Sequence, residues 1–136
     1  MRIIGIFGGQ NVDGLTATVM KEILNGAKEA DCEFVNLNDY HLVADQPGQV
    51  NADLDLLTTK LSAADVWVLA SPTYFGTVAG QFKQLFDCLR PRMVRMTKEG
   101  DSLPGQFKNK HYVSVTSCFA SSLDNTFTHQ LMPHLQ

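Results

Sequence analysis

Long apolar runs are missing from this 136-residue sequence, and none approaches the roughly 18 residues that a membrane-spanning helix needs. We therefore expect no membrane insertion. The apolar stretch at residues 2–7 is shorter than that of most signal peptides and has no small-residue cleavage site after it. Cysteine is also scarce: Cys32, Cys88 and Cys118 are widely separated and form no Cys-x-x-Cys pair. This usage favours a reducing cytoplasm, with the cysteines acting as small buried apolar residues.

A strong excess of charge is absent as well. The chain has 11 Lys and Arg against 14 Asp and Glu, a net charge of -3, which argues against binding nucleic acid through its phosphates. The histidines are too dispersed to predict a metal site. With 44% apolar residues, the length suits one domain over residues 1–136 and is too short for a dinucleotide-binding domain plus a separate substrate domain.

Short apolar runs alternate with segments of helical periodicity. We expect strands at 2–7, 33–37, 66–69 and 112–116, and helices whose apolar stripes cover 19–27, 54–61, 78–89 and 124–131. The sequence also predicts where elements begin and end. Helix caps are expected at Thr16, at Asn51 or Asp53, and at Asp124, ends of elements at Pro72 and Pro91, and irregular structure at 92–110.

This alternation predicts an α/β domain with a doubly wound parallel sheet and helices on both of its faces. Such sheets bind ligands beyond the carboxyl ends of their strands, where the strand order reverses. The loops after Phe7, Ala70 and Thr116 are therefore the places to look for a site.

The first of these loops, residues 8–16, has the composition of an anion-binding turn. Gly9 and Gly14 allow backbone conformations that other residues avoid, so that amide groups can point inward. Leu15 stands where the nucleotide-binding pattern G-x-x-x-x-G-K-[ST] has lysine, and the dinucleotide pattern G-x-G-x-x-G is missing. The loop thus favours a terminal monophosphate held by amide groups, with a plain structural turn as the alternative.

The loop after Ala70 places Tyr74 and Phe75 side by side between Pro72 and Gly76. Two adjacent aromatic side chains cannot both turn into the core, so at least one is expected to face solvent or a ligand. A planar heteroaromatic ring would gain from stacking against it. The alternative is that both side chains pack the loop onto the domain.

The segment Ser71-Pro72-Thr73-Tyr74-Phe75-Gly76, continued by Ala79-Gly80-Gln81-Phe82-Lys83 and Phe86-Asp87, carries a resemblance. It resembles the flavin-contacting segment of flavodoxin-like NAD(P)H-dependent reductases, namely the FMN reductase family and the related tryptophan-repressor-binding-protein-type quinone reductases. The resemblance extends from Arg2 to about Ser117.

The first loop matches the family pattern Gly-Ser-x-Arg-x-x-Gly-Asn-[Ser/Thr] only in part. Three residues agree with the pattern: Gly8, Gly14 and Thr16. Three others replace its Ser, Arg and Asn: Gly9, Asn11 and Leu15. The missing arginine removes a charge that some relatives use for phosphate or nicotinamide recognition.

The resemblance implies a flavodoxin-like sheet of order 2-1-3-4 and an enzyme that uses FMN to pass electrons from NAD(P)H to a quinone, a flavin or a similar small acceptor. It also implies a homodimer or homotetramer. Because FMN performs the redox chemistry, no catalytic protein side chain is expected. The residues implied for the phosphate are Gly9, Gln10, Asn11, Gly14, Leu15 and Thr16, those for the ring are Pro72, Thr73, Tyr74, Phe75 and Gly76, and those for its far side are Ser117 and Cys118.

Several points of difference keep alternatives open. The fifth strand and closing helix of the family fold are not evident, so either the chain is truncated, or the sheet is completed by a partner or left with four strands. Residues 39–60 lack the cysteines of iron-sulfur members. A flavodoxin-type electron carrier, a nicotinamide-binding domain with Asp39 on the ribose, and a non-catalytic truncated module are the rival interpretations. A set of basic residues is expected to be solvated, or else to attract an NADPH phosphate: Arg90, Arg92, Arg95, Lys98, Lys108 and Lys110.

Overall fold

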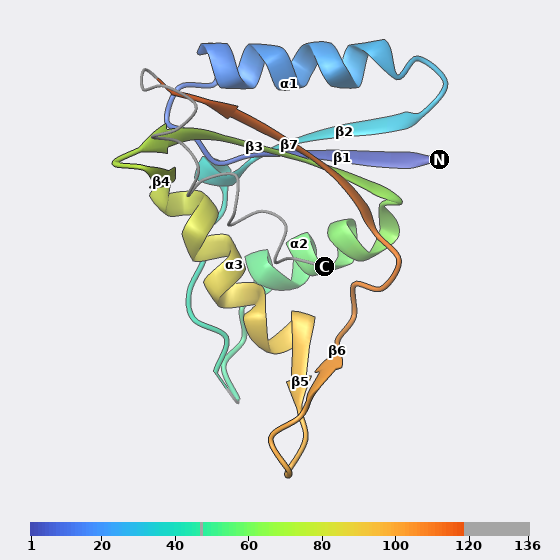
Figure 1. The fold of residues 1–136 in the computed structure, drawn as a ribbon, viewed down its shortest axis with the longest axis vertical. Helices are drawn as coiled ribbons and strands as arrows, with labels where there is room; N and C mark the ends of the chain where they lie inside the picture. Colours follow the sequence, from blue (N-terminus) through green and yellow to red (C-terminus); the bar gives the residue numbers. More distant parts are fainter. Residues whose placement is uncertain (47, 119–136) are drawn as a thin grey trace.

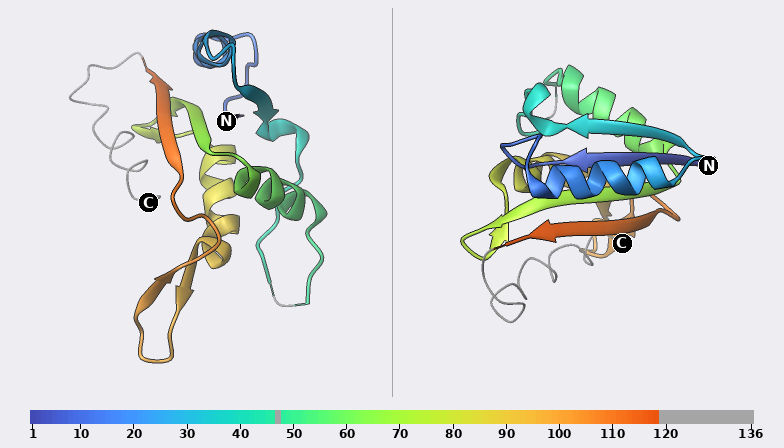
Figure 2. Two further views of the ribbon diagram at one scale, coloured as in Figure 1. Left: turned by 90° about the vertical axis from the view of Figure 1, so that its right-hand side faces the viewer. Right: turned by 90° about the horizontal axis from the view of Figure 1, so that it is seen from above.

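Four parallel strands form the middle layer of the computed structural model, which describes residues 1–46 and 48–118. They are β1 (Arg2–Phe7), β2 (Asp31–Asn36), β3 (Val66–Tyr74) and β7 (His111–Ser117). Their spatial order is β2-β1-β3-β7, with parallel pairing at every step. Figure 2 shows these strands side by side from above. The predicted order 2-1-3-4 is confirmed, with β7 as the fourth parallel strand.

Helices cover both faces of this sheet, as the alternating pattern predicts. Among the described helices, α1 (Leu15–Gly26) lies on one face, and α2 (Ala52–Ala63) and α3 (Gly80–Met93) lie on the other (Figure 1). A short 3-10 turn, η1 (Leu37–Asp39), follows β2, and a two-residue strand, β4 (Thr77–Val78), pairs antiparallel with the end of β3. No helix in the described ranges has both the length and the apolar character needed to cross a membrane.

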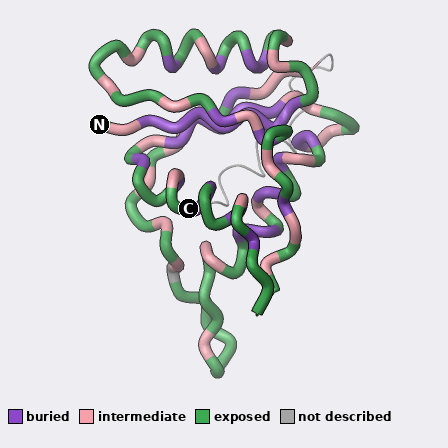
Figure 3. The backbone as a smooth tube through the Cα atoms, turned by 180° about the vertical axis from the view of Figure 1, so that it is seen from behind, coloured by how far each residue is buried: buried purple, intermediate pink, exposed green. Residues whose placement is uncertain are grey.

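Each face of the sheet has its own apolar core, because β1 and β3 are apolar on both sides. Ile4 and Ile6 of β1 pack with residues of α2 and α3, whereas Ile3 and Phe7 pack with Met20 and other residues of α1. This period of two is what a strand buried between helices requires. Figure 3 shows the buried residues concentrated along the middle of the sheet.

The start of α1 differs from the prediction. Gly14, not Thr16, is the N-cap residue, and its carbonyl oxygen accepts a hydrogen bond from the Thr18 amide at 3.0 Å. Thr16 lies inside the first turn and is buried. At α2 the expectation of Asn51 is confirmed, since its side chain accepts from the Leu54 amide at 3.3 Å.

The two prolines do not end their elements. Strand β3 continues through Pro72 to Tyr74, because Pro72 lies beyond the last β1–β3 pair and β7 alone borders it in the parallel sheet. A missing N–H is tolerated at such a position. Helix α3 continues through Pro91 but only as far as Met93, so the predicted helix end is wrong by two residues.

Residues 92–110, expected to be irregular, contain a hairpin. Strand β5 (Val94–Met96) pairs antiparallel with β6 (Ser102–Pro104), and the hairpin projects from the end of α3 away from the sheet (Figure 1). Its turn is closed by a hydrogen bond from the Thr97 amide to the Asp101 carbonyl oxygen at 2.8 Å. Strands of three residues are too short to give a detectable alternation.

The cysteines behave differently from one another. None is in a disulfide, but only Cys88 is buried, whereas Cys32 is exposed on the edge strand β2 and Cys118 is half-buried. The expectation that all three are buried is therefore wrong. Burial raises the pKa of the Cys88 thiol, which disfavours its thiolate form at neutral pH. The predicted helix at 124–131 and the question of a fifth strand lie outside the described residues.

Candidate functional site

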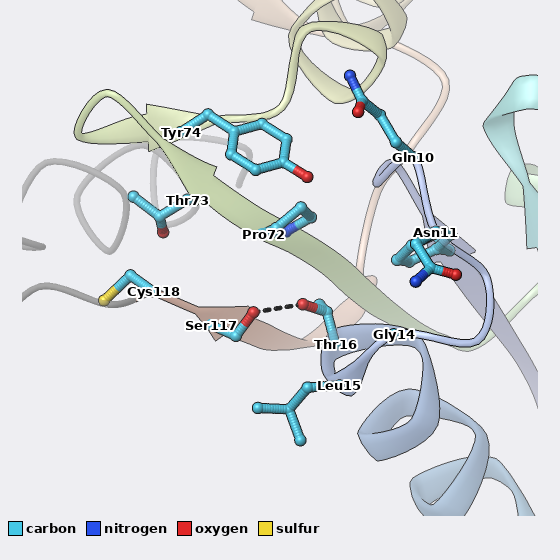
Figure 4. A pocket seen from close by; sticks show the side chains of 11 residues that line it. Gln10, Asn11, Gly14, Leu15, Thr16, Pro72, Thr73, Tyr74, Ser117 and Cys118 are labelled. Atoms are coloured by element: carbon cyan, nitrogen blue, oxygen red, sulfur yellow. Dashed lines mark hydrogen bonds between the residues drawn. The ribbon is translucent and has the colours of Figure 1, made fainter.

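A pocket of about 480 Å³ lies at the carboxyl edge of the sheet, beyond the ends of β1, β3 and β7. It falls in the range of roughly 300–1,000 Å³ that is typical of small-ligand sites. Figure 4 shows the side chains that line it. They lie at the three strand ends, and in the loops after them, that the sequence singled out: Phe7, Gln10, Asn11, Gly14, Leu15, Thr16, Pro72, Thr73, Tyr74, Ser117 and Cys118.

The structure thus brings most of the predicted site residues to one place. Three of them do not line the pocket: Gly9, Phe75 and Gly76. One lining residue, Phe7, was missed. Its signal was its position as the last residue of β1, at the edge where the pocket opens.

The first loop presents unused amide groups. Two amides of the loop already have acceptors. The Gly14 amide donates to the Asn11 carbonyl oxygen at 3.1 Å and so closes a turn, and the Asp13 amide donates to Asn11 Oδ1 at 3.0 Å. Gly14 has no side chain to cap α1. The amides of residues 15–17 consequently have no acceptor within the described chain. Together with the positive end of the helix dipole, they suit an anion.

Glycine is needed at position 9 for a different reason from the one predicted. Neither Gly9 nor Gly14 has a positive φ, so left-handed backbone is not involved. A Cβ on Gly9 would lie 2.5 Å from Phe7 Cζ and 2.9 Å from Pro72 Cδ. The loop therefore lies directly against two residues that line the pocket.

The floor of the pocket joins the first loop to the end of the sheet. Thr16 Oγ1 and Ser117 Oγ are hydrogen-bonded to each other (Figure 4), and Ser117 is the register partner of Pro72. The first turn of α1, the end of β3 and the end of β7 are held together here. The three loops consequently form one site.

The two aromatic residues lie at the end of β3, with Tyr74 as its last residue and Phe75 as the first residue of the two-residue turn to β4. Phe75 and Gly76 have φ angles of 52° and 77°, as the central residues of a type I′ hairpin turn do. Tyr74 lines the pocket and is 42% exposed, and its hydroxyl points toward the side of Gln10 (Figure 4). Phe75 is fully exposed and lies outside the lining. The prediction that at least one aromatic ring faces outward is confirmed.

Charged side chains do not line the described pocket, which contrasts with the basic residues near the end of α3. Arg92, expected to be solvated, is held by Asp45 and Asp55. Lys110 Nζ donates to two carbonyl oxygens at the end of α2. Arg90 and Arg95 are exposed and border a separate hollow. Among the described residues, no group of three or more potential ligands is placed to hold a metal ion.

Taken together, the doubly wound sheet and the pocket at its carboxyl edge define a flavodoxin-like α/β protein. Residues 1–136 match the family described as NADPH-dependent FMN reductase. The chain therefore belongs to that family.

Individual relatives agree with this assignment. The chain is 34% identical over 105 residues to an iron-sulfur flavoprotein of Methanocaldococcus jannaschii, covering 69% of this chain and 54% of that protein. It is 29% identical over 102 residues to an NAD(P)H-dependent FAD/FMN reductase of Geobacillus thermodenitrificans, covering 70% and 55%. The chain spans about half the length of the curated relatives that it matches.

Solved structures show the same fold. An FMN-dependent NADH-azoreductase from Bacillus anthracis, determined in complex with FMN, superposes with a TM-score of 0.74 at 13% identity, covering 98% of this chain and 79% of that one.

Proposed function

We propose that this chain binds FMN in the pocket, reduces it with NAD(P)H and passes the electrons to a quinone, a flavin or a similar small acceptor. The observation that carries the proposal is that an amide-rich loop and an aromatic turn, far apart in sequence, line a single pocket. One suits a phosphate and the other a planar ring, which are the two ends of FMN.

The phosphate would lie at the first turn of α1. The amides of residues 15–17 are available there, and the Thr16 hydroxyl lies beside them. Because none of the described lining side chains is charged, backbone amides, hydroxyls and the helix dipole would supply the stabilisation. This arrangement fits the residues that replace the family's Arg and Asn.

The ring would lie along the end of β3, between Tyr74 and the segment at Ser117 and Cys118. When bound, FMN supplies the acceptor for hydride and the donor of electrons. The protein's part is to bind the ring, orient it and limit access of water on the side of β3 and β7. The backbone of Phe75 and Gly76, which shapes the turn, would act through the position of Tyr74, whereas the Phe75 side chain lies outside the pocket.

We extend the proposal to a homodimer or homotetramer in the cytoplasm, supported by the family assignment and by three cysteines outside any disulfide. An iron-sulfur cluster, as named for the M. jannaschii protein, is not part of the proposal. Residues 39–60 contain no cysteine to hold one.

A spectral titration tests the function directly. The purified protein is titrated with FMN, and NADPH or NADH is then added without oxygen. We expect a perturbed flavin spectrum on binding and bleaching of the yellow colour on reduction. Binding without reduction would identify an electron carrier, and absence of binding would contradict the proposal.

Replacing Tyr74 by alanine should weaken FMN binding about five- to tenfold, because the ring loses a stacking surface worth on the order of 1 kcal/mol. Phe75→Ala is the matched control, since that side chain is fully exposed and outside the pocket. Flavin fluorescence titration of both variants measures the effect. Equal affinities for the two variants would show that Tyr74 does not contact the ring.

A further inference from the structure

The carbonyl oxygen of Gly9, at the start of the first loop, is held from outside the pocket. Asn38 lies in η1, and its Nδ2 donates a hydrogen bond to this oxygen at 2.7 Å. Strand β2, which leads into η1, lies on the side of β1 opposite β3 and β7. Asn38 does not line the pocket. The bond therefore directs the Gly9 carbonyl away from the pocket.

The direction of this carbonyl fixes the direction of the next amide. In a trans peptide the C=O and the following N–H point in opposite directions, and the described chain has no cis peptide. The Gln10 N–H must then point away from Asn38, toward the side where β3 and β7 carry the rest of the lining. It has no acceptor within the described residues, and Gln10 itself lines the pocket.

The Asn38 side chain is fixed by two further partners. Its Nδ2 also donates to Asn36 Oδ1 at 2.8 Å, and its Oδ1 accepts from Gln81 Nε2 at 3.1 Å. Turning the amide over would place its oxygen against two acceptor oxygens. Gln81 and Asn36 thus keep the Asn38 donor aimed at Gly9.

We propose that Asn38 is a positioning residue for the phosphate end of the flavin site. It orients the Gly9–Gln10 peptide so that the Gln10 N–H donates to the phosphate, and Asn38 itself contacts no part of FMN. The inference rests on the proposed function, because it assigns a role within the same site.

FMN and riboflavin separate this role from a general structural one, because they differ only by the phosphate. Asn38→Ala should raise the dissociation constant of FMN about fivefold, the loss expected for one partly exposed hydrogen bond. The dissociation constant of riboflavin should change by less than about twofold. Gln81→Ala leaves Asn38 in place but frees its oxygen, so a smaller shift in the same direction is expected.

Gln84→Ala is the matched control. Gln84 Nε2 donates to the Leu42 carbonyl oxygen at 2.6 Å, the same kind of tether at a place outside the pocket lining. For Gln84→Ala, the ratio of the riboflavin dissociation constant to the FMN dissociation constant should equal the ratio for the unmodified chain.

The outcomes distinguish the two proposals. Suppose that the unmodified chain binds FMN more tightly than riboflavin while Asn38→Ala leaves the ratio of the two dissociation constants unchanged. In that case the positioning role is overturned and the proposed function stands. If the unmodified chain binds neither flavin, the proposed function fails and the positioning role fails with it.

Discussion

Gly9→Ala should raise the dissociation constant of FMN at least about tenfold, which corresponds to roughly 1.4 kcal/mol. A methyl group there would lie 2.5 Å from the ring of Phe7 and 2.9 Å from Pro72, both of which line the pocket. Phe7 is only 1% exposed, so its ring cannot move aside without disturbing the core under α1. The loop or the pocket wall must shift instead, and overpacking of this kind costs about 1–3 kcal/mol. Flavin fluorescence titration measures the loss of FMN affinity, and urea unfolding measures the loss of stability.

Two other glycines provide a graded comparison. Gly14→Ala should have a smaller effect, because its nearest neighbour would be the Asn11 carbonyl oxygen at 3.1 Å. Gly26→Ala, at the end of α1, meets no atom within 4 Å and should leave FMN affinity unchanged while stabilising the helix by up to about 1 kcal/mol. Equal FMN affinities for all three variants would show that the first loop does not border the flavin.

Arg92→Met should lower the free energy of unfolding by about 2–3 kcal/mol at neutral pH. The Arg92 side chain is 15% exposed and holds Asp45 through Nε at 2.9 Å, Asp55 at 2.7 Å and the Thr58 hydroxyl at 2.8 Å. Removing one partner of a buried pair typically costs about 3–5 kcal/mol, and partial exposure of the carboxylates reduces that cost here. Urea unfolding of both proteins provides the measurement.

The same network predicts a pH dependence. The hydrogen bond from Arg92 holds the pKa of the Asp45 carboxyl below its ordinary value. A lowered pKa in the folded state stabilises the fold above the ordinary pKa of about 3.9, and this contribution is lost as the pH falls through the folded value. The stability difference between the unmodified chain and Arg92→Met should therefore shrink below about pH 4.

An exposed ion pair is the control for both effects. Lys83 and Asp87 form an i,i+4 pair on α3 with side chains 52% and 62% exposed. Lys83→Met should change the free energy of unfolding by less than about 0.5 kcal/mol. If Arg92→Met were equally mild, Arg92 would be a solvated surface residue, as its sequence context suggested.

Features that depend on local pattern were predictable. The apolar runs of β1 and β3 and the stripes of α1 to α3 predict the parallel sheet, because a segment apolar on both faces can be buried only between helices. The same logic brought the loops after Phe7 and Ala70 to one edge. Hydrophobic period, with the general rule for doubly wound sheets, pointed to the edge at which the structure has its pocket. The order of the strands was predicted from the resemblance to the FMN reductase family.

Other features depend on neighbours that are distant in sequence. Pro72 and Pro91 are local signals that a strand or a helix ends. Whether the element continues through Pro72 depends on which strand lies beside it, and the position of Pro91 relative to the end of α3 is set by the folded structure. In the sequence nothing distinguishes Cys32 from Cys88. Cys32 is exposed because β2 lies at the edge of the sheet. The strands β5 and β6 are too short to show a recognisable alternation of apolar and polar residues.

The amino-acid sequence on its own determined the α/β layering, the order of the parallel strands and the edge at which a ligand would bind. The layering and the edge follow from hydrophobic periodicity and chain connectivity, and the order follows from the sequence motifs that resemble the FMN reductase family. The tertiary structure alone decided that Gly9 is small because Phe7 and Pro72 lie against it, that Arg92 is held by two carboxylates, and that Asn38 reaches the first loop. Each of these depends on distances between residues far apart in the chain, and those distances exist only once the layers have packed.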